Sequence, residues 1–448
     1  MRSETPAADA LGLGGQALRG WSRRLVSQLP GPIQTIAVSA SSIVGATAAT
    51  SLLGAVYWWL AARQFPAEAV GLASSAISAM TLIATLSSLG LGTFLMGALP
   101  SRPDGGRTLI AASLIISGGG AGVMAFAFAF AAPILSSDLD PLGAGPLPAL
   151  VFAAGAALTA AGLVLDQALI GLLRGGLQLG RNVVLGVTKL GVLFLAGAVL
   201  ARESGMDIYS AWVAGLVFSF LGLAPLLPIR EMLAGVSVTR WVQALPSAMA
   251  TAWKSMLSHQ ALNLALRLPI FLLPVLAVVL VSAVANASFY IAWLVVNLAF
   301  VAPGSLATVL YTVGSGDRDA LAEKIRMTLK LALVLTVAAT IVLLSVAGPL
   351  MSIFGKSYSE NATTVLRILA LSGIPILVKN HYVAVVRIQG RVRAAQPLVW
   401  FGTVLELALA AAGASAAGLE GLAVGWTAAV FVEGIIMYRP VREAAKPR

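Results

Sequence analysis

Apolar runs long enough to cross a lipid bilayer follow one another along almost the whole chain. A hydrocarbon core about 30 Å thick needs about 20 apolar residues per helix, and such runs occur from Ile33 to Tyr438. The interruptions are short and rich in Gly, Pro, Asp and Ser, as in RQFPAE, PSRPDGG and GSGDRD, and these residues are typical of turns. We therefore expect an all-α polytopic membrane protein with twelve transmembrane helices. The expected spans are 33–62, 70–98, 108–134, 147–173, 182–201, 209–228, 255–281, 285–314, 328–348, 362–386, 397–418 and 420–438.

Composition supports this fold class and excludes several kinds of chemistry. Hydrophobic residues make up 58% of the chain and charged residues 10%, whereas about one quarter of the residues in an average soluble domain are charged. The chain has no cysteine and only two histidines, His259 and His381. Thiolate catalysis, disulfides and Cys-ligated metals are therefore excluded, and we expect neither a metal nor an organic cofactor.

The distribution of basic residues predicts how the helices are oriented. If the N-terminus is cytoplasmic, the inner segments carry 22 Lys and Arg residues, and the outer loops carry only Arg63, Arg202 and Lys356. This asymmetry is the positive-inside signal, and it supports an even number of helices with both termini in the cytoplasm. The net charge of +11 then belongs to the cytoplasmic rim, where anionic lipids attract it, so we expect no nucleic-acid partner.

The order of the spans predicts two related halves. Spans one to six and seven to twelve both start on the cytoplasmic side, so a duplication would relate bundles 33–228 and 255–438 by a pseudo-twofold axis along the membrane normal. Residues 1–32 are expected to form a cytoplasmic tail, because the first apolar run is too long for a signal peptide, and residues 439–448 a second one. The connection 229–254 contains Trp and basic residues at helical spacing, which favours an amphipathic helix at the inner interface; a plain linker is the alternative.

Arg267 is the most informative of the basic residues expected inside spans. It follows Lys254 by 13 residues, or about 20 Å along a helix, so neither membrane surface is within easy reach. His259, Asn263 and Arg267 share one helix face because they are spaced by four residues. Prolines 269 and 274 follow and should kink this helix. These three residues are candidate substrate ligands on a cavity wall; the alternative is an arginine that pairs with a carboxylate for packing only.

Helix ten contributes further candidates. Lys356 and Glu360 are expected in an outer turn, with Arg367 about five residues into the helix. Arg367 and His381 are 14 residues apart, nearly four turns, and should share a face, while Lys379 points about 120° away and can reach the inner surface. Arg367 and Lys379 are candidate substrate ligands, and His381 more simply satisfies a hydrogen bond.

Three carboxylates complete the set of intramembrane charges. Asp166 and Lys189 are expected at similar depth in neighbouring antiparallel helices and could form a structural ion pair, or Asp166 could bind a proton or cation. Glu406 lies near the middle of helix eleven, where it could bind a coupling ion, H+ or Na+, or neutralise Arg267. Glu433 is expected at the inner rim beside Arg439.

Three segments carry a resemblance to a known family. They are LAARQFPAEAVGLASSAISAMTLIATLSSLGLGTFL, LNLALRLPIFLLPVLAVVLVSAVANASFYIAWLV and IFGKSYSENATTVLRILALSGIPILVKNHYVAVVRIQGR. With twelve helices, the chain resembles the polysaccharide-biosynthesis branch of the multidrug, oligosaccharidyl-lipid and polysaccharide exporter superfamily over about residues 33–438. Helix one carries no charge between Ile33 and Ala62, which departs from relatives with charged residues there.

This resemblance implies a Wzx-type flippase rather than an enzyme. Such a protein moves a polyprenyl-diphosphate-linked oligosaccharide from the inner to the outer leaflet of the bacterial cytoplasmic membrane by alternating access. Its partners would be the lipid-linked glycan, membrane lipids and other proteins of a polysaccharide assembly pathway. The alternatives are a multidrug or organic-cation exporter of the same fold, a membrane-embedded glycan polymerase or ligase, and a lipid scaffold without transport.

Overall fold

The computed structural model describes residues 51–88, 90–99, 106–172, 174–223, 253–314 and 321–446. The expected N-terminal tail, most of the first span and the connection 229–252 lie outside the described residues. Within these limits every regular element is a helix. The all-α fold class expected from the sequence is therefore confirmed.

The first half contains helical residues 51–64 and then elements α3 to α9. Their bounds are α3 Ala67–Ser87, α4 Leu91–Ala98, α5 Gly106–Leu135, the 3-10 turn η2 Ser137–Leu139, α6 Asp140–Gly143, α7 Pro146–Gly171, α8 Gly175–Phe194, the π-helical turn η3 Leu195–Val199 and α9 Gly205–Leu223. The second half contains α12 to α18. Their bounds are α12 Trp253–Leu280, α13 Ala283–Ala299, α14 Val301–Gly314, α15 Leu321–Ser352, α16 Lys356–Ala370, α17 Gly373–Ile388 and α18 Val392–Ala444.

These elements correspond to the twelve expected spans. By length and hydropathy, eight helices of the described chain can cross a membrane, or ten if the bent pairs α13–α14 and α16–α17 each count as one span. Helix α18 is two limbs joined at Ala417 and Gly418, where Gly418 has a φ of 58°, and residues 51–64 end the first span. The second limb continues to Ala444, so residues 439–444 are helical.

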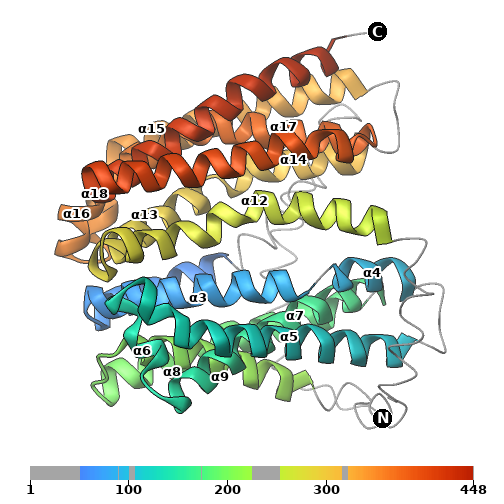
Figure 1. Ribbon diagram of the computed structural model, residues 1–448. Coiled ribbons are helices and arrows are strands. Elements are labelled where there is room, and N and C mark those ends of the chain that lie inside the picture. The colour runs from blue at the N-terminus through green and yellow to red at the C-terminus, as the bar shows by residue number, and fades with distance from the viewer. Residues whose placement is uncertain are drawn as a thin grey trace, which may run out of the picture.

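The helices form two bundles that meet along α3 (Figure 1). Helix α3 packs within the first bundle on α5, α7 and α9, and it also contacts α12 and α13 of the second bundle. Most of its residues are buried, on every side of the helix. A helix that is apolar all round belongs in an interior, and α3 occupies the interior between the two halves.

Hydrogen bonds between the halves cluster at one end of the molecule, which we call the sealed end. Asn286 donates from Nδ2 to the carbonyl of Gly71 at 2.8 Å and to Oγ of Ser74 at 2.9 Å. The carboxylate of Asp138 accepts a hydrogen bond from the backbone N–H of Ala283 at 2.6 Å. Ala283 begins α13, so the carboxylate also lies at the positive end of that helix.

Aromatic side chains add further contacts between the halves at the sealed end; together with the hydrogen bonds above we call these contacts the seal. Trp59 donates from Nε1 to the carbonyl of Ile353 at 3.1 Å, and the rings of Trp58 and Tyr290 lie 4.6 Å apart between centroids. Each of these contacts joins the first half to the second. At the opposite end the ribbons of α12 and α4 lie farther apart than those of α13 and α3 (Figure 1). The orientation predicted from basic residues makes the sealed end the outer end.

Candidate functional site

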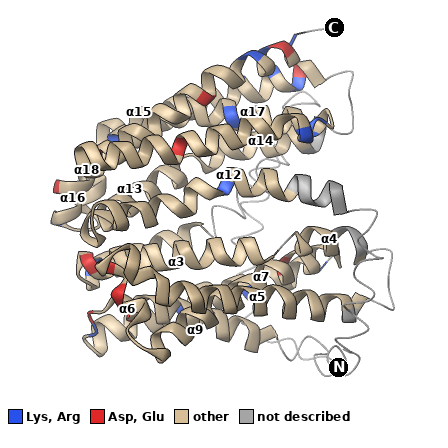
Figure 2. Cartoon of the chain, viewed as in Figure 1, with Lys and Arg blue, Asp and Glu red and all other residues tan. Residues whose placement is uncertain are grey.

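Arg267 is an exposed cation in the middle of a transmembrane helix. It lies on α12, which contacts α3 of the first half, and it is exposed, whereas its neighbours Ala265 and Pro269 are buried. Among the described residues it has no ion-pair or hydrogen-bond partner, so the alternative of an arginine paired with a carboxylate is not what the structure contains. Helix α12 continues through Pro269 and Pro274 without a break. Figure 2 shows that basic residues are sparse along this helix.

A second guanidinium stands beside Arg267. Arg387 of α17 donates from Nη2 to Oδ1 of Asn263 at 2.7 Å, and Asn263 precedes Arg267 by one helical turn, so these residues are neighbours on one face. The buried Nε of Arg387 has no hydrogen-bond partner among the described residues. Sequence reasoning placed Arg387 in an inner loop and missed it, because its role depends on contact with another helix. The side chain of His259 lies outside the described residues.

The other residues expected on helix ten have different surroundings. Helix α16 begins at Lys356, so Lys356 and Glu360 lie in its first turns rather than in a loop, and they form an exposed ion pair at 3.8 Å. Arg367 is exposed in the last turn of α16. Between it and His381 the chain bends by 47°, so the expected common face is interrupted. His381 is buried, with Nδ1 2.9 Å from the carbonyl of Leu377.

Lys379 is the centre of a buried charge cluster. Its ammonium lies 2.5 Å from Oε1 of Glu406 and 2.8 Å from Oε2 of Glu433. Trp426 donates from Nε1 to Oε2 of Glu406 at 2.6 Å. Lys379, Glu406 and Glu433 are all buried, so the expectations that Lys379 reaches the inner surface and that Glu433 belongs to the inner rim are wrong.

The cluster contains two carboxylates and one ammonium. If all three groups are ionised, one negative charge is in excess, and the site can take up one further cation such as a proton or Na+. Oε1 of Glu433 has no hydrogen-bond partner among the described residues. A methyl group at Gly402 would overlap the carboxylate of Glu433, so the absence of a side chain at Gly402 makes room for the second acid.

In the first half, Asp166 pairs with Arg181 and not with Lys189. Arg181 donates from Nε to Oδ1 at 3.0 Å and from Nη2 to Oδ2 at 2.7 Å, a bidentate pair. The two residues lie at equal depth on either side of the short turn between α7 and α8. Arg181, expected in the loop, lies inside α8 because this helix begins at Gly175 rather than at residue 182.

Lys189 is left without a carboxylate. It is 6% exposed, and its ammonium lies 3.6 Å from the centroid of the Trp212 ring and 4.9 Å from that of Tyr57. Among the described residues it has no ion-pair or hydrogen-bond partner. A charge at a helix centre costs roughly 2.5–3.5 kcal/mol on insertion scales, and a desolvated cation–π contact contributes about 2 kcal/mol. The two rings therefore offset a cost of similar size, and the ammonium is stabilised only marginally.

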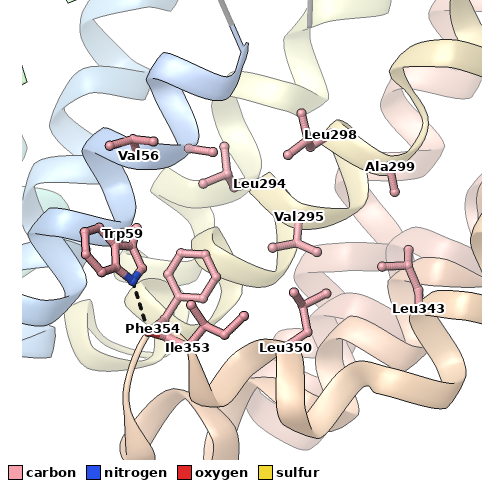
Figure 3. A pocket seen from close by; sticks show the side chains of 11 residues that line it. Val56, Trp59, Leu294, Val295, Leu298, Ala299, Leu343, Leu350, Ile353 and Phe354 are labelled. Carbon is pink, nitrogen blue, oxygen red and sulfur yellow. Dashed lines mark hydrogen bonds between the residues drawn. The ribbon is translucent and has the colours of Figure 1, made fainter. Parts of the chain in front are cut away.

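An apolar cavity of about 380 Å³ lies on the seam between the halves (Figure 3). It is lined by Val56 and Trp59 of the first half and by residues of α13 and α15, among them Leu294 and Leu350. The hydrogen bond from Trp59 to Ile353 lies at its edge (Figure 3). The lining is hydrocarbon almost throughout, so this cavity suits an alkyl chain rather than a polar group.

No family model matches the chain, and no curated protein matches it. Solved structures do share its fold. A multidrug resistance MATE family transporter of the MOP superfamily in an inward-facing conformation superimposes with a TM-score of 0.68, at 17% identity, over 88% of this chain and 94% of that one. An outward-facing conformation of such a transporter gives 0.59, at 18% identity, over 92% and 95%.

The lipid II flippase MurJ in an inward closed conformation has a TM-score of 0.64, at 14% identity, over 89% of this chain and 86% of that one. The chain therefore has the fold that these MATE transporters and MurJ share.

Proposed function

We propose that this protein moves an anionic, lipid-linked oligosaccharide from the inner to the outer leaflet by alternating access. The proposed substrate carries a polyprenyl diphosphate, as in the Wzx-type branch that the sequence resembles. The two bundles would rock about their contact along α3, opening one end and then the other. We place the protein in the bacterial cytoplasmic membrane with both termini inside, and a polysaccharide assembly pathway would supply its protein partners.

The observation that carries the proposal is the pair of guanidinium groups at Arg267 and at Arg387, which binds Asn263 one turn before Arg267. Arg267 is exposed and unpaired among the described residues, and Arg387 is held one turn away by Asn263. Guanidinium groups bind phosphate oxygens through two parallel hydrogen bonds, and a site without compensating acids prefers an anion. A diphosphate cannot cross hydrocarbon unaided, whereas these two guanidinium groups would replace part of its hydration.

The carboxylates argue against an organic-cation exporter, the main alternative. A cation site needs free acids or an open aromatic cage. Asp166, Glu406 and Glu433, the three carboxylates that the sequence analysis singled out, each bind a basic side chain. The charge left available on α12 is positive, which favours an anionic substrate.

The lipid part of the substrate would remain in hydrocarbon. The seam cavity is apolar and is lined by both halves, so it supports passage of a molecule whose tail stays at the membrane face.

The excess carboxylate of the Lys379 cluster supports coupling to a cation, H+ or Na+, with Glu406 and Glu433 as the groups that would bind it. Asp166 is a weaker candidate for this role, since Arg181 occupies both of its oxygens.

Replacing Arg267 tests the proposal. In proteoliposomes with a fluorescent polyprenyl-diphosphate glycan, Arg267→Ala should lower the rate of leaflet exchange about tenfold to a hundredfold, because a hydrogen bond to a charged group contributes about 1.5–3 kcal/mol. Arg267→Lys, which keeps the charge but loses the bidentate geometry, should be intermediate.

Lys356→Ala is the matched control, since Lys356 is an exposed cation away from α12. This variant should transport at the wild-type rate. Equal exchange by wild type, Arg267→Ala and protein-free vesicles would contradict the proposal. Export of a cationic dye that is unaffected by Arg267→Ala, with no glycan movement, would support the multidrug alternative.

A further inference from the structure

Lys189 is the buried basic residue that the proposed transport site does not use. It lies on α8, ten residues before the end of η3, or about 15 Å along the helix axis, and no carboxylate of the described residues pairs with it. Its Nζ instead faces the rings of Trp212 and Tyr57. Gly215 of α9 lets α8 approach closely at this level, because a methyl group there would meet the Cβ of Lys189.

The ionisable groups on the elements packed around Lys189 have other partners. On α9, the hydroxyl of Tyr209 donates to the carbonyl of Phe152, and Asp207 accepts from the backbone of Ser204. On α7, Asp166 is bound to Arg181.

Arg181, on α8 itself, lies two turns away, or about 12 Å. On residues 51–64, Tyr57 presents its ring to the ammonium while its hydroxyl donates to the carbonyl of Ile208, and Arg63 is exposed near the sealed end. No described anion therefore stands ready to compensate a charge on Lys189.

The rings around Lys189 belong to the seal between the halves. Trp212 lies 5.3 Å from Tyr57, and Tyr57 lies 5.5 Å from Trp58. Trp58 in turn contacts Tyr290 of α13, in the other half, at 4.6 Å. Separation of the halves at the sealed end would break the contact between Trp58 and Tyr290 and admit water beside Trp58 and Tyr57. The hydration of Lys189 is thus linked to the state of the seal.

We propose that Lys189 is a proton-binding site whose occupancy follows the opening and closing of the sealed end. Opening admits water, and the amine, neutral while the halves are sealed, takes a proton from hydronium and leaves a water molecule. Closing removes that water, an N–H bond of the ammonium breaks with its electron pair left on nitrogen, and the proton leaves on water as hydronium. Burial disfavours the charged form, so by linkage proton uptake favours the open state. The inference rests on the alternating access proposed above and identifies a group that makes it sensitive to pH.

The test measures the seal directly, without substrate. The native chain has no cysteine, so spin labels can be placed at S137C and S357C, two exposed positions near the sealed end in opposite halves. Pulsed electron–electron distance measurements in nanodiscs between pH 5.5 and 8.5 give the ratio of open to sealed molecules. In the wild type this ratio should rise as pH falls, by up to about tenfold per pH unit for one linked proton.

Variants assign the response to Lys189. K189M should remain mostly sealed at every pH, so its ratio of open to sealed molecules should lose a pH dependence of up to about tenfold per pH unit. K189R keeps its charge at every pH, so it should remain mostly open and lose the same pH dependence. K330M removes an exposed lysine of α15 and should keep the wild-type response. K189Q serves as a second neutral variant if K189M does not fold.

The inference is overturned if K189M or K189Q keeps the pH dependence of the wild type. It is also overturned if the wild type shows no pH dependence, or if K330M loses it to the same extent. Because no glycan lipid is present, this failure is distinct from failure of the proposed function, which the Arg267 transport assay decides.

Discussion

Lys379→Met is expected to destabilise the protein strongly, because it leaves two buried acids without their counter-ion. The ammonium of Lys379 compensates Glu406 and Glu433, both buried in the second half. Removing one partner of a buried ion pair leaves uncompensated charge and costs about 3–5 kcal/mol. The purified variant should therefore lose its folded, monodisperse state at a clearly lower temperature than the wild type, as measured by thermal unfolding and size-exclusion chromatography in the same detergent.

A rescue separates this cause from loss of packing. Lys379→Met combined with Glu406→Gln and Glu433→Gln removes all three charges at similar volume and should recover most of the lost stability. Lys189→Met is the matched control, because Lys189 is equally buried but leaves no carboxylate behind. A Lys379→Met variant as stable as Lys189→Met, or a triple variant no better than the single one, would contradict the assignment.

Gly71→Ala is expected to shift the protein strongly away from the sealed conformation. A methyl group at this position would overlap the backbone carbonyl of Ala283 in α13, and neither backbone can move without separating the halves. The substitution should also weaken the hydrogen bonds of Asn286 to Gly71 and Ser74. Overpacking of this kind costs about 1–3 kcal/mol, so the ratio of open to sealed molecules should rise roughly fivefold to more than a hundredfold.

The same S137C and S357C labels measure this shift. Gly119→Ala is the control, because Gly119 also lies inside a long helix and a methyl group there meets no other atom within 4 Å. It should leave the distance distribution unchanged. A Gly71→Ala distribution identical to that of the wild type would show that the seal between α3 and α13 tolerates the added methyl.

The residues expected at the site illustrate where sequence reasoning succeeds and where it fails. Asn263 and Arg267 were found together because both lie on one helix, and helical spacing fixes their relation. Arg387 and Trp426 were missed, and Glu433 was wrongly expected at the inner rim, because each acts across a contact with another helix or the other limb of α18. The expected pair of Asp166 with Lys189 was wrong because of an error in one helix boundary. Helix α8 starts seven residues earlier than expected, which places Arg181 rather than Lys189 at the depth of Asp166.

The sequence by itself determined the helices of this protein and their expected orientation. Hydrophobic runs, turn residues and the distribution of Lys and Arg act locally, since each span must satisfy its own backbone and match the bilayer. The tertiary structure decided which buried charges are paired and which are available. That choice depends on the rotation and contacts of helices far apart in the chain, and those contacts enclose Lys379 between two acids, leave Arg267 exposed and surround Lys189 with aromatic rings.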